Sequence, residues 1–157
     1  MKSGSNEYLR GLRIFTIALM AGVVLFSIIV FLMPYIDPVK SDHLKPYSTI
    51  VFLVVSVFAL GCLFIGRLIF NRKLESIRNS GRDVEEKLNL YRTAFISYLA
   101  TCEFPAIVGI ICYMLTENYW LLIIPTLILI AMAMKFPSKE RLTSDLALDW
   151  EEQQVLE

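Results

Sequence analysis

Residues 14–36 read IFTIALMAGVVLFSIIVFLMPYI, a stretch without a single charged side chain. A helix needs about 20 apolar residues to cross the hydrocarbon core of a bilayer, and this stretch is long enough. It is longer than the apolar region of a usual secretory signal peptide, and no small-residue cleavage site follows it. We therefore expect it to stay in the protein as a membrane anchor.

The composition of the chain agrees with a membrane environment. Of its 157 residues, 56% are hydrophobic, which is above the share of about 45–50% in soluble globular domains. This length leaves room for one domain. The 15 basic and 15 acidic residues cancel, so no excess of charge favours a nucleic acid as a partner. We expect a single transmembrane domain over residues 1–157 that binds no nucleic acid.

Three further apolar stretches approach or exceed the length of a membrane span. We expect four transmembrane helices, at about residues 12–36, 49–70, 94–115 and 119–136. The fold class should be all-α, because an isolated strand would leave its backbone polar groups unpaired in lipid. The fourth helix is the shortest and contains Pro125, so the pattern defines its ends least well.

The basic residues flank these helices unevenly. Only Lys40 and Lys45 lie in the first connection, and the short third connection has no basic residue. On the other side lie Lys2, Arg10, Arg13, Arg72, Lys73, Arg78, Arg82, Lys87, Lys135, Lys139 and Arg141. Loops rich in Lys and Arg stay in the cytoplasm, so we expect both termini and the second connection to be cytoplasmic.

Two segments outside the spans are predicted to be amphipathic helices. The helical pattern breaks near Gly81, and the third helix should begin at about residue 83, in the cytoplasm. Within the cytoplasmic tail, residues 137–157, another helix is expected at about 138–154. Their apolar residues recur on one face, with Val84, Leu88 and Tyr91 in the first helix and Leu142, Leu146 and Trp150 in the second.

One acidic residue lies deep inside an apolar stretch. Glu103 is about ten residues into the third span, which places it roughly 15 Å from the cytoplasmic edge. A charged carboxylate there costs on the order of 2 to 3 kcal/mol, so the group must be protonated, paired or hydrated. Pro105 cannot donate a backbone hydrogen bond and should kink the helix, which frees the carbonyl of Thr101. Glu103 and Thr101 are therefore candidate ion-binding residues.

The same acid has two other interpretations. It can be structural and hold helices together by bonding to a hydroxyl group or to Arg67, which lies about one turn inside the second span. It can also be an acid that pairs with a group of a partner subunit. The sequence leaves all three interpretations open.

Residues 99–115 read LATCEFPAIVGIICYML. This segment resembles the carboxylate-bearing helix of rotary ATPase proteolipid subunits, in which a mid-helix acid is followed by Pro or Ala and then by Ile-x-Gly. The resemblance implies an ion-binding role for Glu103. The preceding span departs from that family, because Ser56, Gly61 and Gly66 are not the dense alternating glycines that let proteolipid helices form a ring. As a whole, the chain resembles small uncharacterised four-helix membrane proteins of bacteria, which implies the bacterial inner membrane and no particular activity.

Sequence motifs for catalysis and cofactor binding are absent. The chain contains no phosphate-binding loop, dinucleotide fingerprint, zinc-protease helix or nucleophile elbow. Cys62, Cys102 and Cys112 share no metal-ligand spacing and are interpreted as small buried apolar residues. We therefore expect neither enzymatic activity nor a cofactor or metal, and a lipid-handling enzyme is the weakest alternative.

The leading hypothesis is an accessory or scaffold subunit that acts through helix packing and its two cytoplasmic helices. Its partners would be membrane lipids and either further copies of itself or another membrane protein. The alternative is a proton or cation path through an oligomer, with Glu103 as the titrating group.

Overall fold

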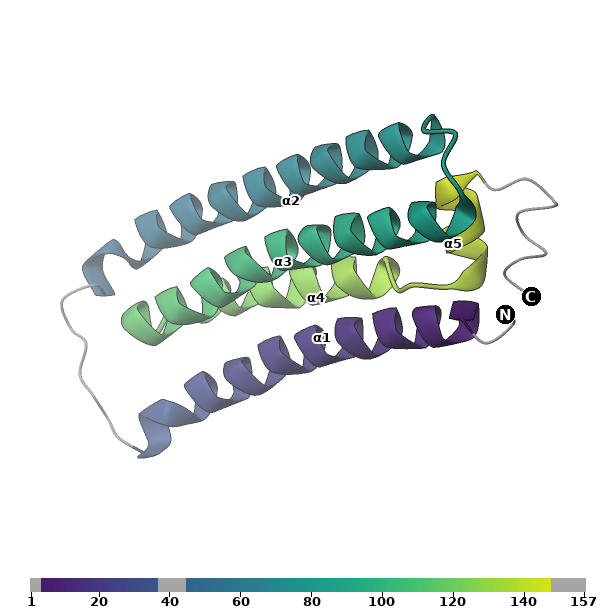
Figure 1. The fold of residues 1–157 in the computed structure, drawn as a ribbon. Coiled ribbons are helices and arrows are strands. Elements are labelled where there is room, and N and C mark those ends of the chain that lie inside the picture. The colour runs from purple at the N-terminus through teal and green to yellow at the C-terminus, as the bar shows by residue number, and fades with distance from the viewer. Residues whose placement is uncertain (1–3, 37–44, 148–157) are drawn as a thin grey trace.

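The computed structural model describes residues 4–36 and 45–147. All regular structure within them is helical, which confirms the expected all-α fold class. In chain order the helices are α1 (Gly4–Ile36), the 3-10 helix η1 (Lys45–Tyr47), α2 (Ser48–Arg78), α3 (Val84–Thr116), the 3-10 helix η2 (Tyr119–Leu122), α4 (Ile123–Met134) and α5 (Lys139–Leu146). Helices α1 to α4 run side by side, and α5 lies across one end of them (Figure 1).

Three of the helices are long and apolar enough to cross a membrane. These are α1, α2 and α3, with 33, 31 and 33 residues. Helix α4 has only 12 residues, and η2 adds one short turn before it. Counted together with α5, this segment passes the same test, but its two parts are bent by 81°. The described residues thus hold three candidate spans, or up to four if the bent pair is one span.

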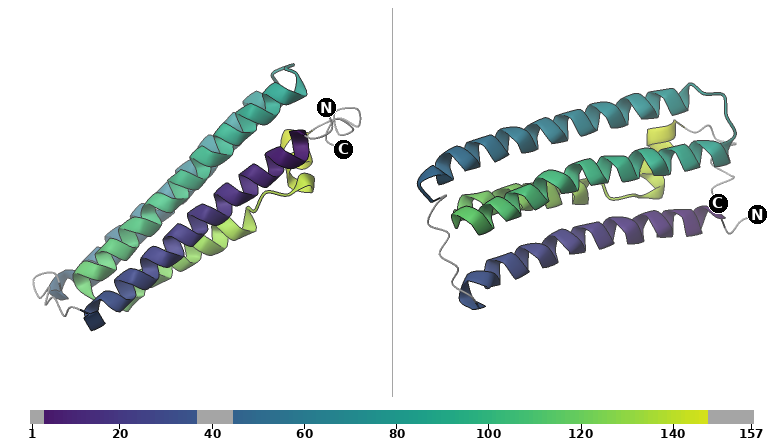
Figure 2. Two further views of the ribbon diagram at one scale, coloured as in Figure 1. Left: turned by 60° about the horizontal axis from the view of Figure 1, so that its bottom comes forward. Right: turned by 60° about the vertical axis from the view of Figure 1, so that its left-hand side comes forward.

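Helix α3 is central to the packing. Helices α2 and α3 form one layer, and α1 and α4 form a second layer beside it (Figure 2). Besides α2, α3 also contacts α1 and α4. Its buried side chains run along its whole length, as Tyr91, Leu99 and Ile110 show. The other three long elements are therefore arranged around one helix.

A glycine and a group of aromatic rings join α2 to α3. A Cβ atom at Gly66 would lie 3.2 Å from the side-chain methyl of Thr101, so glycine allows this close approach. One turn further along α2, the buried ring of Phe70 packs against α3. Its centroid lies 6.1, 6.2 and 5.3 Å from the ring centroids of Tyr91, Phe95 and Tyr98. This interface is closely packed.

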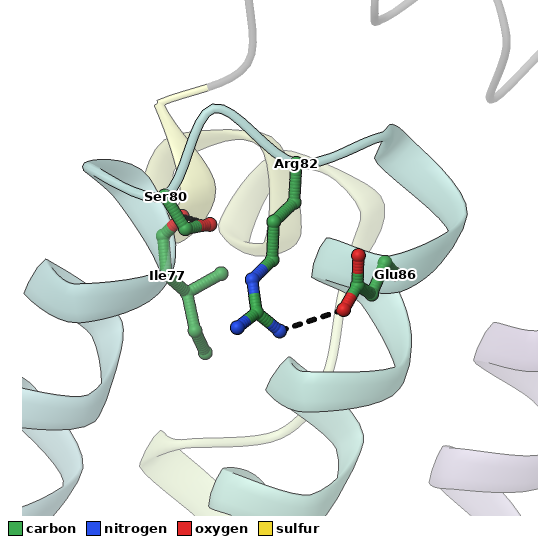
Figure 3. A network of polar contacts seen from close by, with 4 residues as sticks. All are labelled: Ile77, Ser80, Arg82 and Glu86. Atoms are coloured by element: carbon green, nitrogen blue, oxygen red, sulfur yellow. Dashed lines mark hydrogen bonds and ion pairs between the residues drawn. The ribbon is translucent and has the colours of Figure 1, made fainter.

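Local polar contacts end α2 and begin α3 (Figure 3). The Ser80 hydroxyl donates to a carbonyl in the last turn of α2, at 2.7 Å. Arg82 forms an ion pair with Glu86 over 2.7 Å. The Asp83 carboxylate accepts a hydrogen bond of 2.9 Å from the backbone N–H of Val84, the first residue of α3. The predicted break in this region and the start of a helix near residue 83 are both confirmed.

The fourth helix differs from its prediction at both ends. The pattern predicts one helix over 119–136, whereas its first turn is the 3-10 helix η2 and α4 ends at Met134. Pro125 lies in the first turn of α4. A backbone N–H in the first turn of a helix has no acceptor within that helix, so proline, which lacks this group, is tolerated there. In a longer helix its ring would clash with the carbonyl four residues earlier. Pro137 disfavours a helical conformation for the residue before it, which explains the early end.

The tail helix is shorter than predicted and is packed on the chain itself. A helix is predicted at about 138–154, but α5 ends at Leu146, and Ala147 follows in the left-handed conformation with φ of 48°. The predicted apolar face is confirmed where it is described, because Leu142 and Leu146 are 1% and 2% exposed. Trp150 lies outside the described residues. This face of α5 is therefore part of the core of the described residues.

Candidate functional site

Glu103 lies at the edge of the buried stripe of α3. Leu99, Cys102 and Ile110 on that stripe are fully buried, while the side chain of Phe104 is 58% exposed. Glu103 itself is partly exposed. Among the residues that the structure describes, it has no hydrogen bond or ion pair. The acid therefore lies at the boundary between the buried and the exposed faces of α3.

Thr101 points away from Glu103. Its hydroxyl donates to the carbonyl of Ser97 at 2.8 Å, and its methyl group faces Gly66 of α2. Positions i and i+2 of a helix do not face each other, and here they lie on opposite sides of α3. Pro105 is buried, and α3 stays helical on both sides of it. One chain alone therefore does not bring the two candidate ion-binding residues into one pocket.

Arg67 does not pair with Glu103. Both residues are described, and no ion pair joins them. Arg67 is exposed on α2, and its electrostatic neighbours include Tyr98 of α3 and Lys135, which follows α4. It thus lies near the charges at the end of α4 and forms no ion pair with the acid.

A polar cluster that the sequence did not predict fixes α5 in place. We call the end of the molecule where α1 begins, α2 meets α3 and α5 lies the basic end (Figure 1). There the Tyr91 hydroxyl donates to the carboxylate of Asp145 at 3.0 Å. Arg78 donates from Nε to the Asp145 carbonyl at 2.6 Å and from Nη2 to the Ser144 carbonyl at 3.2 Å. A guanidinium group suits these carbonyls, since the last turn of a helix leaves them without partners.

The same end is also tied to the other helical layer. Arg13 of α1 donates from Nε to the carbonyl of Pro137 at 3.0 Å. Arg141 of α5 donates back to the carbonyl of Met134, the last residue of α4. Helix α5 and the segment before it therefore contact both layers. The only signal for this in the sequence is the apolar spacing of Leu142 and Leu146, which does not say what they pack against.

A groove runs along the surface between α1 and α4. It consists of two adjoining hollows of about 330 and 450 Å³, and Val24 lines both. Its lining residues, almost all apolar, are Ile17, Met20, Ala21, Val24, Ser27, Ile28, Phe31 and Leu32 from α1, with Leu122, Pro125, Thr126, Leu129, Ala133 and Phe136 opposite. We call this surface the α1–α4 groove. The sequence offers no signal for it, because an apolar groove and a plain lipid-facing surface have the same composition.

The three thiols are free and do not form a cluster. Cys102 is fully buried, as predicted, whereas Cys62 and Cys112 are only partly buried. Within residues 4–36 and 45–147 no group of three or more His, Cys, Asp or Glu side chains is placed to hold a metal ion.

Comparisons of the chain with protein-family models, with curated proteins and with solved structures found no match. The resemblance of residues 99–115 to a proteolipid helix therefore stays a prediction. Three features of the described residues bear on function. They are Glu103, the polar cluster at the basic end and the α1–α4 groove.

Proposed function

We propose that the chain is a non-enzymatic membrane protein of four transmembrane helices that serves as an accessory subunit. In this proposal it packs in the membrane against a helix of another chain, and that helix presents a hydrogen-bond donor to Glu103. The observation that supports it is the position of Glu103 at the partly exposed edge of α3, with no hydrogen bond or ion pair among the described residues. A carboxyl group in hydrocarbon costs less free energy when it is hydrogen-bonded, and bonds between membrane helices contribute about 1 to 2 kcal/mol in peptides.

The proposed membrane arrangement counts η2 and α4 as the fourth span. They supply 4 and 12 residues, which is short for a bilayer crossing. A short span is accommodated by local thinning of the bilayer or by flanking charged residues that reach the interface. Lys135 directly follows α4 and can act in this way.

The proposed orientation places the basic end in the cytoplasm. Arg10, Arg13, Arg78, Arg82 and Arg141 belong to segments at this end, where α1 begins, α2 meets α3 and α5 lies. Excess Lys and Arg mark the cytoplasmic side of membrane proteins. Both termini and the connection between α2 and α3 would then be cytoplasmic, in the inner membrane if the host is a bacterium.

The two cytoplasmic helices have a smaller part in this proposal than the sequence suggested. The apolar stripe of the α3 extension, Val84, Leu88 and Tyr91, is buried in the chain. The described apolar residues of α5 are buried as well. Attachment to a partner is therefore assigned to the open edge of α3 inside the membrane.

The test uses a photoreactive amino acid, benzoylphenylalanine, in native membranes. Ala100 is exposed and precedes Glu103 by three residues, so both lie on one face of α3. A probe at Ala100 should give one discrete protein adduct. The matched control is a probe at Leu60, which is 67% exposed on α2. Equal labelling from both positions, or no protein adduct from Ala100, would contradict the proposal.

Variants of the acid sharpen this test. Glu103→Leu should remove the adduct from Ala100, because an apolar side chain offers no hydrogen bond. Glu103→Gln should keep it, because an amide can still accept one. An adduct of twice the chain's mass would identify a second copy as the partner, and a different mass would identify another protein.

A proton or cation path through an oligomer is the second candidate function. The observation that favours it is the same partly exposed acid, which a neighbouring chain could enclose together with an ion. Purified protein in liposomes should then show flux that Glu103→Gln abolishes. Since Gln keeps the hydrogen bond but not the charge, the two functions are separated by this one variant. Equal flux with and without the acid would end the second candidate.

A further inference from the structure

A charged residue lies at the basic end of the α1–α4 groove. On α1, Ile17 and Val24 line the groove. Arg13 lies one turn before Ile17, and Arg10 two turns before it, so both arginines share the groove face of the helix. Arg13 also reaches across the groove end, because its Nε donates to the carbonyl of Pro137 at 3.0 Å.

The guanidinium of Arg13 keeps free donors at this position. Its one hydrogen bond uses Nε, and the two terminal nitrogens have no hydrogen-bond partner among the described residues. The side chains of Arg13 and Arg10 are both exposed. A guanidinium with free donors is suited to bind a phosphate group.

The rest of the groove is almost entirely apolar. Its two hydroxyl groups each donate a hydrogen bond within their own helix. The Ser27 hydroxyl donates to the backbone carbonyl of Val23 at 2.8 Å, and the Thr126 hydroxyl donates to the backbone carbonyl of Leu122 at 2.8 Å. Membrane helices pack closely against rows of small residues. The larger hollow instead contains larger apolar side chains beside Ala21 and Ala133, and so favours an acyl chain over a helix. The groove is apolar along its length and cationic at one end.

We propose that the α1–α4 groove binds one anionic phospholipid, with an acyl chain along the groove and the phosphate against Arg13 and Arg10. A phospholipid has the matching pattern of a long apolar chain and one anionic head at the interface. The inference rests on the proposed placement in the membrane but not on a partner at Glu103. It assigns a ligand to the side of the molecule opposite the closely packed α2–α3 layer (Figure 2).

The test is a lipid titration of the purified full chain, read by native mass spectrometry. Delipidated protein in mild detergent is given phosphatidylglycerol or phosphatidylcholine with identical acyl chains. The wild type should retain one phosphatidylglycerol in preference to phosphatidylcholine. Arg13→Gln should weaken the binding of phosphatidylglycerol about tenfold and leave phosphatidylcholine unchanged, since it removes a charge-assisted contact to the phosphate. The matched control is Arg72→Gln, an exposed arginine outside the groove.

A second variant tests the apolar part of the site. Ala133 is exposed and lines the larger hollow, so Ala133→Phe should fill it without disturbing the core and should lower the retention of both lipids. Ala18→Phe is the control, because Ala18 is exposed on α1 outside the groove lining. Circular dichroism verifies that each variant keeps its helices.

Equal retention of the two lipids by the wild type would overturn the inference. So would variants at Arg13 and Ala133 that retain as much lipid as their controls. A photoreactive probe at Ala133 that labels protein in place of lipid would show that a helix occupies the groove. Glu103→Leu should leave the retained lipid unchanged, so the failure of this inference and the failure of the proposed partner site are distinguishable.

Discussion

The α2–α3 layer and the α1–α4 layer pack in different ways. In the first, Gly66 lets the two helices approach closely, and the ring of Phe70 lies among three aromatic rings of α3. In the second, the helices leave two hollows of about 330 and 450 Å³ between them. Stability should depend mainly on the first layer, while the second has room for a ligand. Substitutions in the two layers should therefore differ in their effect.

Loss of the Phe70 ring should have the largest effect. Phe70 is 4% exposed, and Phe70→Ala should lower the free energy of unfolding by about 3 to 5 kcal/mol, because it leaves a cavity among the aromatic rings. Unfolding in mixed detergent micelles measures this change. Phe64→Ala is the control, since Phe64 is 66% exposed on the same helix and should change stability by less than about 0.5 kcal/mol. Similar losses from both variants would show that the α2–α3 interface does not dominate stability.

The close approach at Gly66 should be nearly as sensitive. Gly66→Leu places a branched side chain where a Cβ alone would already be 3.2 Å from Thr101. The helices must separate, and we expect a loss of about 1 to 3 kcal/mol. The same substitution at Gly61, where nothing lies within 4 Å of an added Cβ, should not destabilise the protein. If Gly66→Leu is tolerated as well as Gly61→Leu, the two helices do not pack as closely as described.

The long helices could be predicted from the sequence because their signal is local. The apolar stretches 14–36, 49–70 and 94–115 each carry enough hydrophobicity to be recognised alone. The break between α2 and α3 was also visible, since its polar contacts join residues close in sequence. The late start and the early end of the fourth helix could have been anticipated from Pro125 and Pro137 respectively, since proline restricts the backbone wherever it occurs.

The contacts of the sites could not be predicted, because they join distant parts of the chain. Tyr91 and Asp145 are separated by 54 positions, and Arg13 and Pro137 by 124. No residue pattern indicates such pairs in a single sequence. Glu103 stands out as an acid in an apolar stretch, but whether it had a partner depended on every helix around it. The separation of Glu103 from Thr101 could be predicted, since a spacing of two residues places side chains on different faces of a helix.

The contact between α5 and the first layer should have a moderate effect. Tyr91→Phe removes the hydroxyl that donates to Asp145 and should lower stability by about 1 kcal/mol. Hydrogen exchange should also become faster in α5, because one of its links to α3 is lost. Tyr119→Phe is the control, since Tyr119 is 64% exposed and begins η2, beyond the C-terminal end of α3. Unchanged exchange in α5 would mean that its position does not depend on this bond.

The α1–α4 layer should tolerate a side chain that destabilises the α2–α3 layer. Ala133→Leu adds the same branched group as Gly66→Leu, but into a hollow of about 450 Å³, so we expect a change of less than about 0.5 kcal/mol. The two variants, unfolded under the same conditions, compare the layers directly. A loss at Ala133 as large as that at Gly66 would mean that α1 and α4 close upon each other in the folded protein. The groove would then have no room for an acyl chain, whatever the charge at its end.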